Sequence, residues 1–230
     1  GKTELIFLID RAKDCVYYFK VADKNHIHIT KRRAFLKTVS ILDNIYTTKP
    51  LIEEIELAEL SSELQIGYWS YNYDPSNDCL YICTSSNSRT APEGKFLITE
   101  IKVDTWKIKQ YEITNTTDKY LRTEGNWGMF VTEGYLLLRG YDAPYDVYKI
   151  QITNSANVVK LKRTNVTNIN GVPKFVINGR VYYEYSYEQL LIADLATNEI
   201  MPPETQTLFN SSYTMSVTPV RNEPLIYFCD

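Results

Sequence analysis

The chain has 230 residues, of which 44% are hydrophobic and 23% are charged, and its formal net charge is −3. This composition is typical of a soluble globular protein and provides no broad basic surface for nucleic acid. The apolar runs at 5–9 and 135–138 are far shorter than the roughly 20 residues that cross a bilayer. We therefore expect neither a nucleic-acid partner nor insertion into a membrane.

A short segment recurs along the chain, with two apolar residues, two freer positions, an apolar anchor and then polar turn residues. The anchors are Ile9, Ile55, Ile101, Ile150 and Leu195, spaced by 46, 46, 49 and 45 residues. The step from the last anchor through the C-terminus to the first is 44 residues, which suggests a closed ring. Repeats of roughly 40 to 50 residues are typical of propeller blades with four antiparallel strands.

The N-terminal quarter fits this scheme least well. Residues 26–35 and 38–46 have the composition of strands, whereas 51–64 fits either a strand or a short Glu-rich helix. Residues 66–114 then fit one blade, with a long insertion at 84–95.

The clearest blade covers 127–163, with strands at 127–132, 135–140, 146–152 and 158–163 and polar turns between them. The next blade has strands at 174–177, 180–185 and 190–195. Asn178-Gly179 joins the first two of these strands, and it predicts a tight primed turn with positive φ at both positions.

These patterns predict a single all-β domain over residues 1–230. We expect a five-bladed β-propeller of four-stranded antiparallel blades, whose last blade is closed by both termini through antiparallel pairing of 5–9 with 225–229. A partial or larger propeller is the alternative.

The segment Asp194-Leu195-Ala196-Thr197-Asn198-Glu199 resembles the third strand and turn of WD-type repeats, and 101–105 resembles it more faintly. The Gly-His and Trp-Asp dipeptides of that family are absent, as is the paired glycine of kelch repeats. The resemblance is therefore to β-propeller repeat proteins in general and to no specific family.

Residues with metal-binding or catalytic chemistry are sparse. His26 and His28 share one strand face, and Asn72, Asp74, Asn77 and Asp78 cluster near a turn. Neither set has the spacing of a known metal site, so we predict no metal and no cofactor. The resemblance to propellers includes glycoside hydrolases, but the expected inner strands lack acidic residues, and their ends carry only Asp74, Glu124 and Glu133.

Aromatic residues stand out, because the chain has 19 tyrosines and 3 tryptophans. Many of those at predicted loops fall on one face of a propeller, where Tyr and Trp commonly build binding hot spots. Packing of the same rings between blades is the alternative. The predicted binding residues are Tyr68, Trp69, Arg89, Trp127, Arg139, Tyr141, Tyr145, Tyr187 and Tyr213.

We accordingly predict a non-enzymatic module that recognises a protein or peptide through this aromatic face. A carbohydrate-binding propeller is the second hypothesis, because aromatic rings with Asn and Asp neighbours also suit sugars. A glycoside hydrolase-like enzyme is the third.

The cysteines and sequons bear on the compartment. Cys79 and Cys83 are four residues apart on one expected strand, too far for a mutual disulfide, whereas Cys15 and Cys229 would pair only if the termini meet. Glycans on the sequons Asn115, Asn165 and Asn210 would crowd the predicted binding face. We therefore lean towards an intracellular location.

Overall fold

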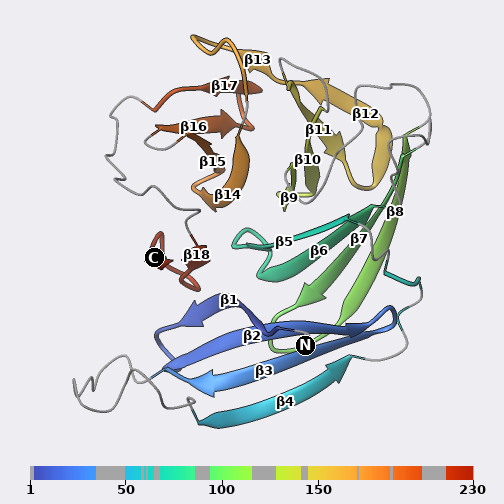
Figure 1. The fold of residues 1–230 in the computed structure, drawn as a ribbon, viewed down its shortest axis with the longest axis vertical. Helices are drawn as coiled ribbons and strands as arrows, with labels where there is room; N and C mark the ends of the chain where they lie inside the picture. The colour runs from blue at the N-terminus through green and yellow to red at the C-terminus, as the bar shows by residue number, and fades with distance from the viewer. Residues whose placement is uncertain are drawn as a thin grey trace. The chain divides into compact units, whose positions relative to one another are not determined.

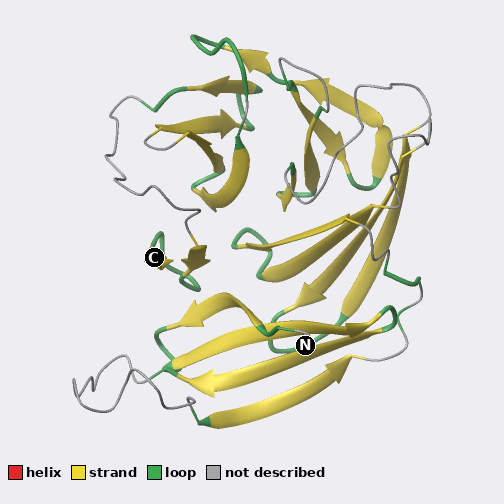
Figure 2. Ribbon diagram, in the orientation of Figure 1, coloured by secondary structure: helices red, strands yellow, loops and turns green. Residues whose placement is uncertain are grey.

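The structure is a computed structural model, and it describes residues 3–34, 50–57, 60, 62–64, 68–85, 94–115, 128–140, 145–169, 171–186, 189–203 and 216–229. Every regular element in these ranges is a strand (Figure 2). The chain divides into two compact units: unit 1 contains Gly1–Glu63 and Val217–Phe228, and unit 2 contains Leu64–Ser216 and Cys229–Asp230.

Unit 1 contains a four-stranded antiparallel sheet in the order β1-β2-β3-β4. Its strands are β1 (Leu5–Asp10), β2 (Cys15–Asp23), β3 (His26–Arg33) and β4 (Leu51–Leu57). The helical alternative for 51–64 is thus wrong over 51–57. Two of the repeat anchors are also not equivalent, since Ile9 lies in the first strand of this sheet and Ile55 in its fourth.

The C-terminal segment reaches β1 in a different way from the one predicted. Strands β18 (Ser216–Pro219) and β19 (Ile226–Cys229) pair with each other. Ile9 forms a single parallel bridge with Val220, and the Arg221 backbone N–H donates to the Ile9 carbonyl at 2.8 Å. The predicted antiparallel pairing of 5–9 with 225–229 is therefore replaced by one parallel bridge.

Unit 2 contains three sheets (Figure 1). The first two have the orders β5-β6-β7-β8 and β9-β10-β11-β12, and the third has the order β13-β17-β16-β15-β14. Their strands are β5 (Tyr68–Asp74), β6 (Cys79–Ser85), β7 (Gly94–Lys102), β8 (Ile108–Asn115), β9 (Met129–Thr132), β10 (Tyr135–Arg139), β11 (Val147–Gln151), β12 (Asn154–Lys160), β13 (Lys162–Arg163), β14 (Val172–Ile177), β15 (Arg180–Ser186), β16 (Gln189–Asp194) and β17 (Glu199–Met201). All pairs are antiparallel except β13 with β17.

The turns of unit 2 follow the sequence signals closely. Asn178 and Gly179 have φ values of 51° and 75°, which confirms the primed turn. The expected turn at 154–157 is wrong, because Asn154 already pairs with Gln151 and opens β12. A register shift after Ile150 tightens that hairpin to a two-residue connection.

Side-chain alternation builds the core between the sheets of unit 2. One buried cluster includes Tyr81, Ile98, Val131 and Leu136, and joins the β5–β8 sheet to the β9–β12 sheet. A second joins the β9–β12 sheet to the β13–β17 sheet through residues such as Leu137, Val147, Val181 and Tyr183. The β9–β12 sheet is therefore a two-sided layer, with one apolar face towards the β5–β8 sheet and the other towards the β13–β17 sheet.

The all-β class and the repeated four-stranded antiparallel sheets are confirmed. The single domain over 1–230 stays a prediction, as does the count of five blades. No helix in the described ranges has the length and apolarity needed to span a bilayer.

Candidate functional site

The structure describes three of the predicted binding side chains, which are Trp69, Arg139 and Tyr145. Tyr68 is described only as the first residue of β5. Arg89, Trp127, Tyr141, Tyr187 and Tyr213 lie outside the described residues.

Arg139 and Tyr145 come together across the connection between β10 and β11. The Arg139 guanidinium carbon lies 5.1 Å from the centre of the Tyr145 ring, which is a cation–π contact. Arg139 Nη1 also donates to the Gly171 carbonyl at 3.4 Å, just before β14. Burial lowers the pKa of Arg139 from its ordinary value, but a guanidinium still keeps its charge at neutral pH.

The backbone at this position supports the contact in two unusual ways. Tyr145 has a φ of 56°, a left-handed conformation that is uncommon for a bulky residue. Gly128 lies opposite Arg139, whose N–H donates to the Gly128 carbonyl at 3.1 Å. A Cβ on Gly128 would lie 2.8 Å from the Arg139 Cβ, so glycine is needed for this close approach.

Tyr183 is a third member of the group. Arg139 lies within electrostatic range of both Tyr145 and Tyr183, and Tyr183 is 0% exposed. Its hydroxyl has no hydrogen-bond partner among the described residues. Burial raises the pKa of Tyr183 far above its ordinary value, so the hydroxyl stays protonated and can donate. We call Arg139, Tyr145 and Tyr183 the Arg139 site.

An ion pair between Lys174 and Glu184 links the neighbouring strands β14 and β15. Lys174 Nζ lies 3.2 Å from Glu184 Oε2, and both side chains are mostly buried. Glu184 follows Tyr183 in β15 and pairs with Val172, next to Gly171.

Trp69 belongs to a different surface. The Ser70 hydroxyl donates to the Met129 carbonyl, so the side chains of Trp69 and Tyr71 project from the opposite face of β5. Their rings stack on each other, with centres 6.1 Å apart and planes at 26°. The structure therefore does not bring Trp69 to Arg139, and the expected single aromatic face is not formed by its described members.

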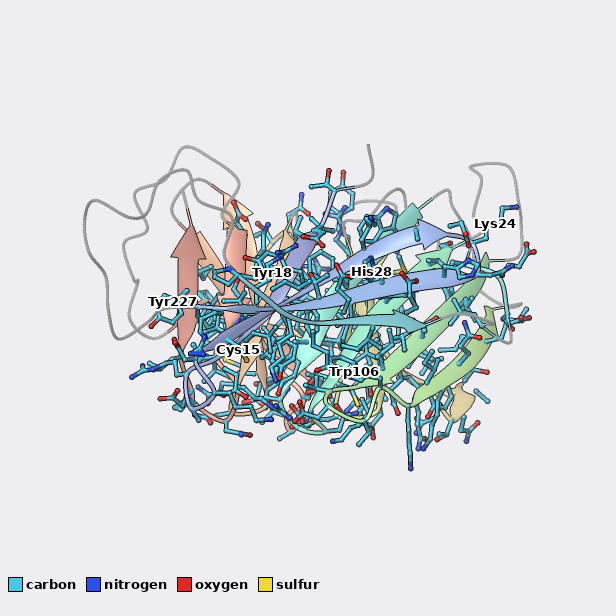
Figure 3. The ribbon with its side chains drawn as sticks, turned by 90° about the horizontal axis from the view of Figure 1, so that it is seen from below. Cys15, Tyr18, Lys24, His28, Trp106 and Tyr227 are labelled. Atoms are coloured by element: carbon cyan, nitrogen blue, oxygen red, sulfur yellow. The ribbon has the colours of Figure 1, made fainter. Side chains whose placement is uncertain are left out.

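The alternative metal and acid residues are engaged elsewhere. The Asn72 side chain is hydrogen-bonded to the Val131 backbone. Asp74 accepts hydrogen bonds from Thr132 and Glu133, so these side chains do not converge with Asp78 on one point. His26 contacts Asp23. His28 lies on β3 (Figure 3), with its Nε2 3.7 Å from Glu56 Oε1. No metal-binding group of three His, Cys, Asp or Glu side chains occurs among the described residues.

The thiols are also structural. Cys15, Cys79 and Cys83 are free and buried. Burial raises the pKa of Cys79 and Cys83 to about 12, which keeps both in the unreactive thiol form.

Tyr183 is the residue that sequence reasoning missed as a site residue. Its segment, Val181-Tyr182-Tyr183, alternates like any strand that packs between sheets, and Tyr183 does pack there. The unpartnered hydroxyl depends on which groups of the neighbouring sheet surround it. No signal in the sequence reports that.

Comparison with known proteins finds similarity in structure but not in sequence. No family model matches the chain, and no curated protein matches it. A crystal structure of Myxococcus xanthus glutaminyl cyclase is similar over 96% of this chain and 82% of that chain, with a TM-score of 0.43 and 11% identity. The predicted non-enzymatic module for protein or peptide recognition is contradicted by this finding, because the similar structure is that of an enzyme. The sheets agree with a general likeness to propellers, whereas nothing supports WD-type repeats specifically. At this identity and TM-score the likeness assigns no activity to the present chain.

Proposed function

We propose that unit 2 binds a small molecule at the Arg139 site. The observation that carries this proposal is a guanidinium partly withdrawn from water, set on a tyrosine whose backbone is left-handed. Strained backbone and desolvated charge both cost free energy, and they tend to gather where a protein binds a ligand.

The position of the site supports the same proposal. Arg139 ends β10, Tyr145 precedes β11, Gly171 precedes β14, and Tyr183 lies in the middle of β15. Arg139 of the β9–β12 sheet thus contacts the backbone just before β14 of the next sheet, and Leu137 and Tyr183 belong to the apolar cluster between these two sheets. A few convergent polar groups beside an apolar body are typical of sites for small ligands.

The test is a screen of a library of small metabolites by ligand-observed NMR on the full chain. We expect ligands that bind the unaltered chain and are lost in Arg139→Gln. Lys31→Gln is the matched control, because Lys31 also lies over a tyrosine, 5.7 Å from the centre of the Tyr17 ring, but belongs to unit 1. A screen in which no ligand depends on Arg139 would refute the proposal.

We also infer that the sheets of unit 2 are propeller blades. Ser70 and Asn72 of β5 bond Met129 and Val131 of β9 in ascending order, so these innermost strands run parallel, with the outer strands turned away (Figure 1). The four larger sheets and the β18–β19 hairpin support a count of five blades.

A further inference from the structure

Strand β4 forms the outer edge of the unit 1 sheet. It stands last in the order β1-β2-β3-β4, and in the described part of the chain it pairs with β3 and with no other strand. In an antiparallel edge strand, every second residue turns its N–H and C=O away from the neighbouring strand. The edge of β4 therefore presents a row of backbone donors and acceptors that the sheet itself does not use.

The side chains of β4 leave this edge accessible. All of its seven residues except Ile55 and Leu57 are exposed. Leu51 and Ile52 are each 47% exposed, more than any other large apolar side chain in the described ranges. A register shift beside Ile52 interrupts the pairing with β3 at one end, whereas the register is regular over 53–57. Since edge strands that bind nothing are usually covered or interrupted along their length, residues 53–57 are the accessible part of this edge.

The two faces of β4 differ in charge. Glu53 lies opposite Lys31 of β3, so a cation already stands beside this carboxylate. Successive side chains of a strand point to opposite faces, so Glu54 and Glu56 share the other face. Thr30, which carries no charge, lies opposite Glu54.

Glu56 also keeps its carboxylate towards solvent. His28 lies opposite it in β3, but the His28 Nε2 is 3.7 Å from Glu56 Oε1, which is beyond hydrogen-bonding distance. The Glu56 side chain is 66% exposed. Two exposed carboxylates, those of Glu54 and Glu56, thus stand at alternate positions on one face of an open strand edge.

We propose that the outer edge of β4 binds an extended segment of a partner protein, which adds to the sheet as a strand and carries basic residues at two alternate positions. An added strand gains affinity from main-chain hydrogen bonds and specificity from its alternate side chains. Basic side chains next to Glu54 and Glu56 form cross-strand ion pairs. The partner residue between them lies next to Ile55, where an apolar side chain fits.

The same carboxylates disfavour a second copy of this chain as the occupant. Pairing of two β4 strands would bring the three glutamates of each strand into one interface, and like charges on neighbouring strands destabilise a sheet. Charged side chains are a common means by which proteins prevent edge-to-edge association of identical copies. The edge of β4 is therefore closed to itself and open to a basic strand.

The probe for this edge is a fluorescently labelled heptapeptide, Thr-Val-Lys-Val-Lys-Val-Thr, with both ends blocked and both lysines on one face of the strand. Fluorescence anisotropy measures its binding to the full chain, and we expect a dissociation constant below about 1 mM. The same peptide with glutamates in place of the lysines should bind at least about tenfold more weakly, because attraction becomes repulsion at two positions.

Two variants of β4 form a matched pair. Glu54→Gln should weaken binding of the lysine peptide by about two- to fivefold, the size of one cross-strand ion pair. Glu53→Gln should leave it unchanged, because this residue lies on the face that receives the valines. Both side chains are exposed, so neither variant should unfold the chain. In the double variant Glu54→Lys, Glu56→Lys, the preference should reverse, and the glutamate peptide should bind more tightly.

Two further peptides test pairing through the backbone. One is N-methylated at its valines and the other at its lysines. Because alternate N–H groups of a strand point to opposite sides, one of these peptides should lose binding and the other should retain it. An equal effect of the two methylations would show that charge acts without strand addition, and would overturn the proposal.

The charge pattern has its own contrary outcomes. Equal binding of the lysine and glutamate peptides, or equal effects of Glu53→Gln and Glu54→Gln, would contradict recognition of a basic strand at this edge. A dimer in analytical ultracentrifugation that dissociates in Ile52→Lys would assign the edge to a second copy and overturn the proposal as well.

Discussion

The Asp74 side chain, at the end of β5, joins two sheets of unit 2 by hydrogen bonds to Thr132 and Glu133. It is 0% exposed. Its Oδ1 accepts from the Ser76 N–H and the Thr132 hydroxyl, and its Oδ2 accepts from the Ser76 hydroxyl and the Glu133 N–H, all at 2.8–3.1 Å. Hydrogen bonds of this charged kind explain how a carboxylate is tolerated inside the molecule.

Asp74→Asn should destabilise the chain by about 3 kcal/mol, because an amide NH2 cannot accept and leaves two donors unpaired. Asp194→Asn is the control. Asp194 accepts from the Ala196 and Thr197 N–H groups through Oδ1, and an asparagine retains that acceptor. Its Oδ2 lies 3.3 Å from the half-exposed Arg180, and an ion pair of this kind contributes little. The Asp194→Asn variant should therefore lose less than about 1 kcal/mol of stability. Urea unfolding measures both, and equal losses would contradict the role given to Asp74.

The buried thiols predict a loss of stability at alkaline pH. Burial, with a smaller contribution from Glu100 at Cys79, raises the pKa of Cys79 and Cys83 from 9.0 to about 12. The folded state thus holds protons that the unfolded state releases. The stabilisation is complete below pH 9 and falls as the pH rises towards 12.

Urea unfolding at pH 8 and pH 10 measures this effect. We expect the unfolding free energy to fall between the two values, and to fall less in a Cys79→Ala, Cys83→Ala variant, whose cavities lower stability at both pH values alike. Identical pH dependence in the two proteins would show that other groups cause the loss.

Gly128 determines how closely β9 and β10 approach each other beside the Arg139 site. Gly128→Ala would place a methyl group 2.8 Å from the Arg139 Cβ and 3.3 Å from the Arg139 backbone nitrogen, so the strands must separate there. We expect a loss of about 1–3 kcal/mol in urea unfolding and weaker binding of the ligands that depend on Arg139.

Gly134→Ala is the matched control on the same hairpin. Gly134 has a φ of 78° and no atom within 4 Å of an added Cβ, so the variant carries backbone strain of about 1–2 kcal/mol without crowding. Its affinity for those ligands should match that of the unaltered chain. Comparable losses of affinity in both variants would mean that general destabilisation, and not the position of Arg139, weakens binding.

Local signals predicted some elements well and others not. The Asn178-Gly179 turn and the strands on either side of it were predictable, because tight-turn chemistry is local. The start of β12 at Asn154 was not, since Asn154-Ser155-Ala156-Asn157 resembles a loop until the pairing with β11 is known. The N-terminal sheet was also misassigned, because similar apolar segments occur in its first and fourth strands.

The same contrast holds for the candidate site. Arg139 and Tyr145 were predicted and do meet, because both flank one strand connection. Trp69 was assigned to the same face, but the direction of its side chain depends on how β5 packs against β9. Tyr183 was missed because an unpartnered hydroxyl is a property of the packed sheets and not of the strand.

Within unit 1, a buried ion pair links two segments that are far apart in the sequence. Arg221 Nη1 lies 3.2 Å from Asp10 Oδ2, across 211 residues of sequence. Asp10 Oδ1 also accepts from the Lys13 N–H at 3.0 Å. The two side chains are only 9% and 6% exposed, so removing one partner leaves a buried charge without this compensation.

Arg221→Met should therefore cost about 3–5 kcal/mol in urea unfolding, because it leaves the Asp10 carboxylate buried without its cation. The exposed pair Arg11–Glu223, at 3.6 Å, joins the same two segments and gives the control. Arg11→Met should cost no more than about 1 kcal/mol. Adding Asp10→Asn to Arg221→Met removes the stranded charge and should recover part of the loss. If Arg11→Met and Arg221→Met prove equally costly, simple contact between the termini, and not the buried charge pair, holds the C-terminal segment to β1.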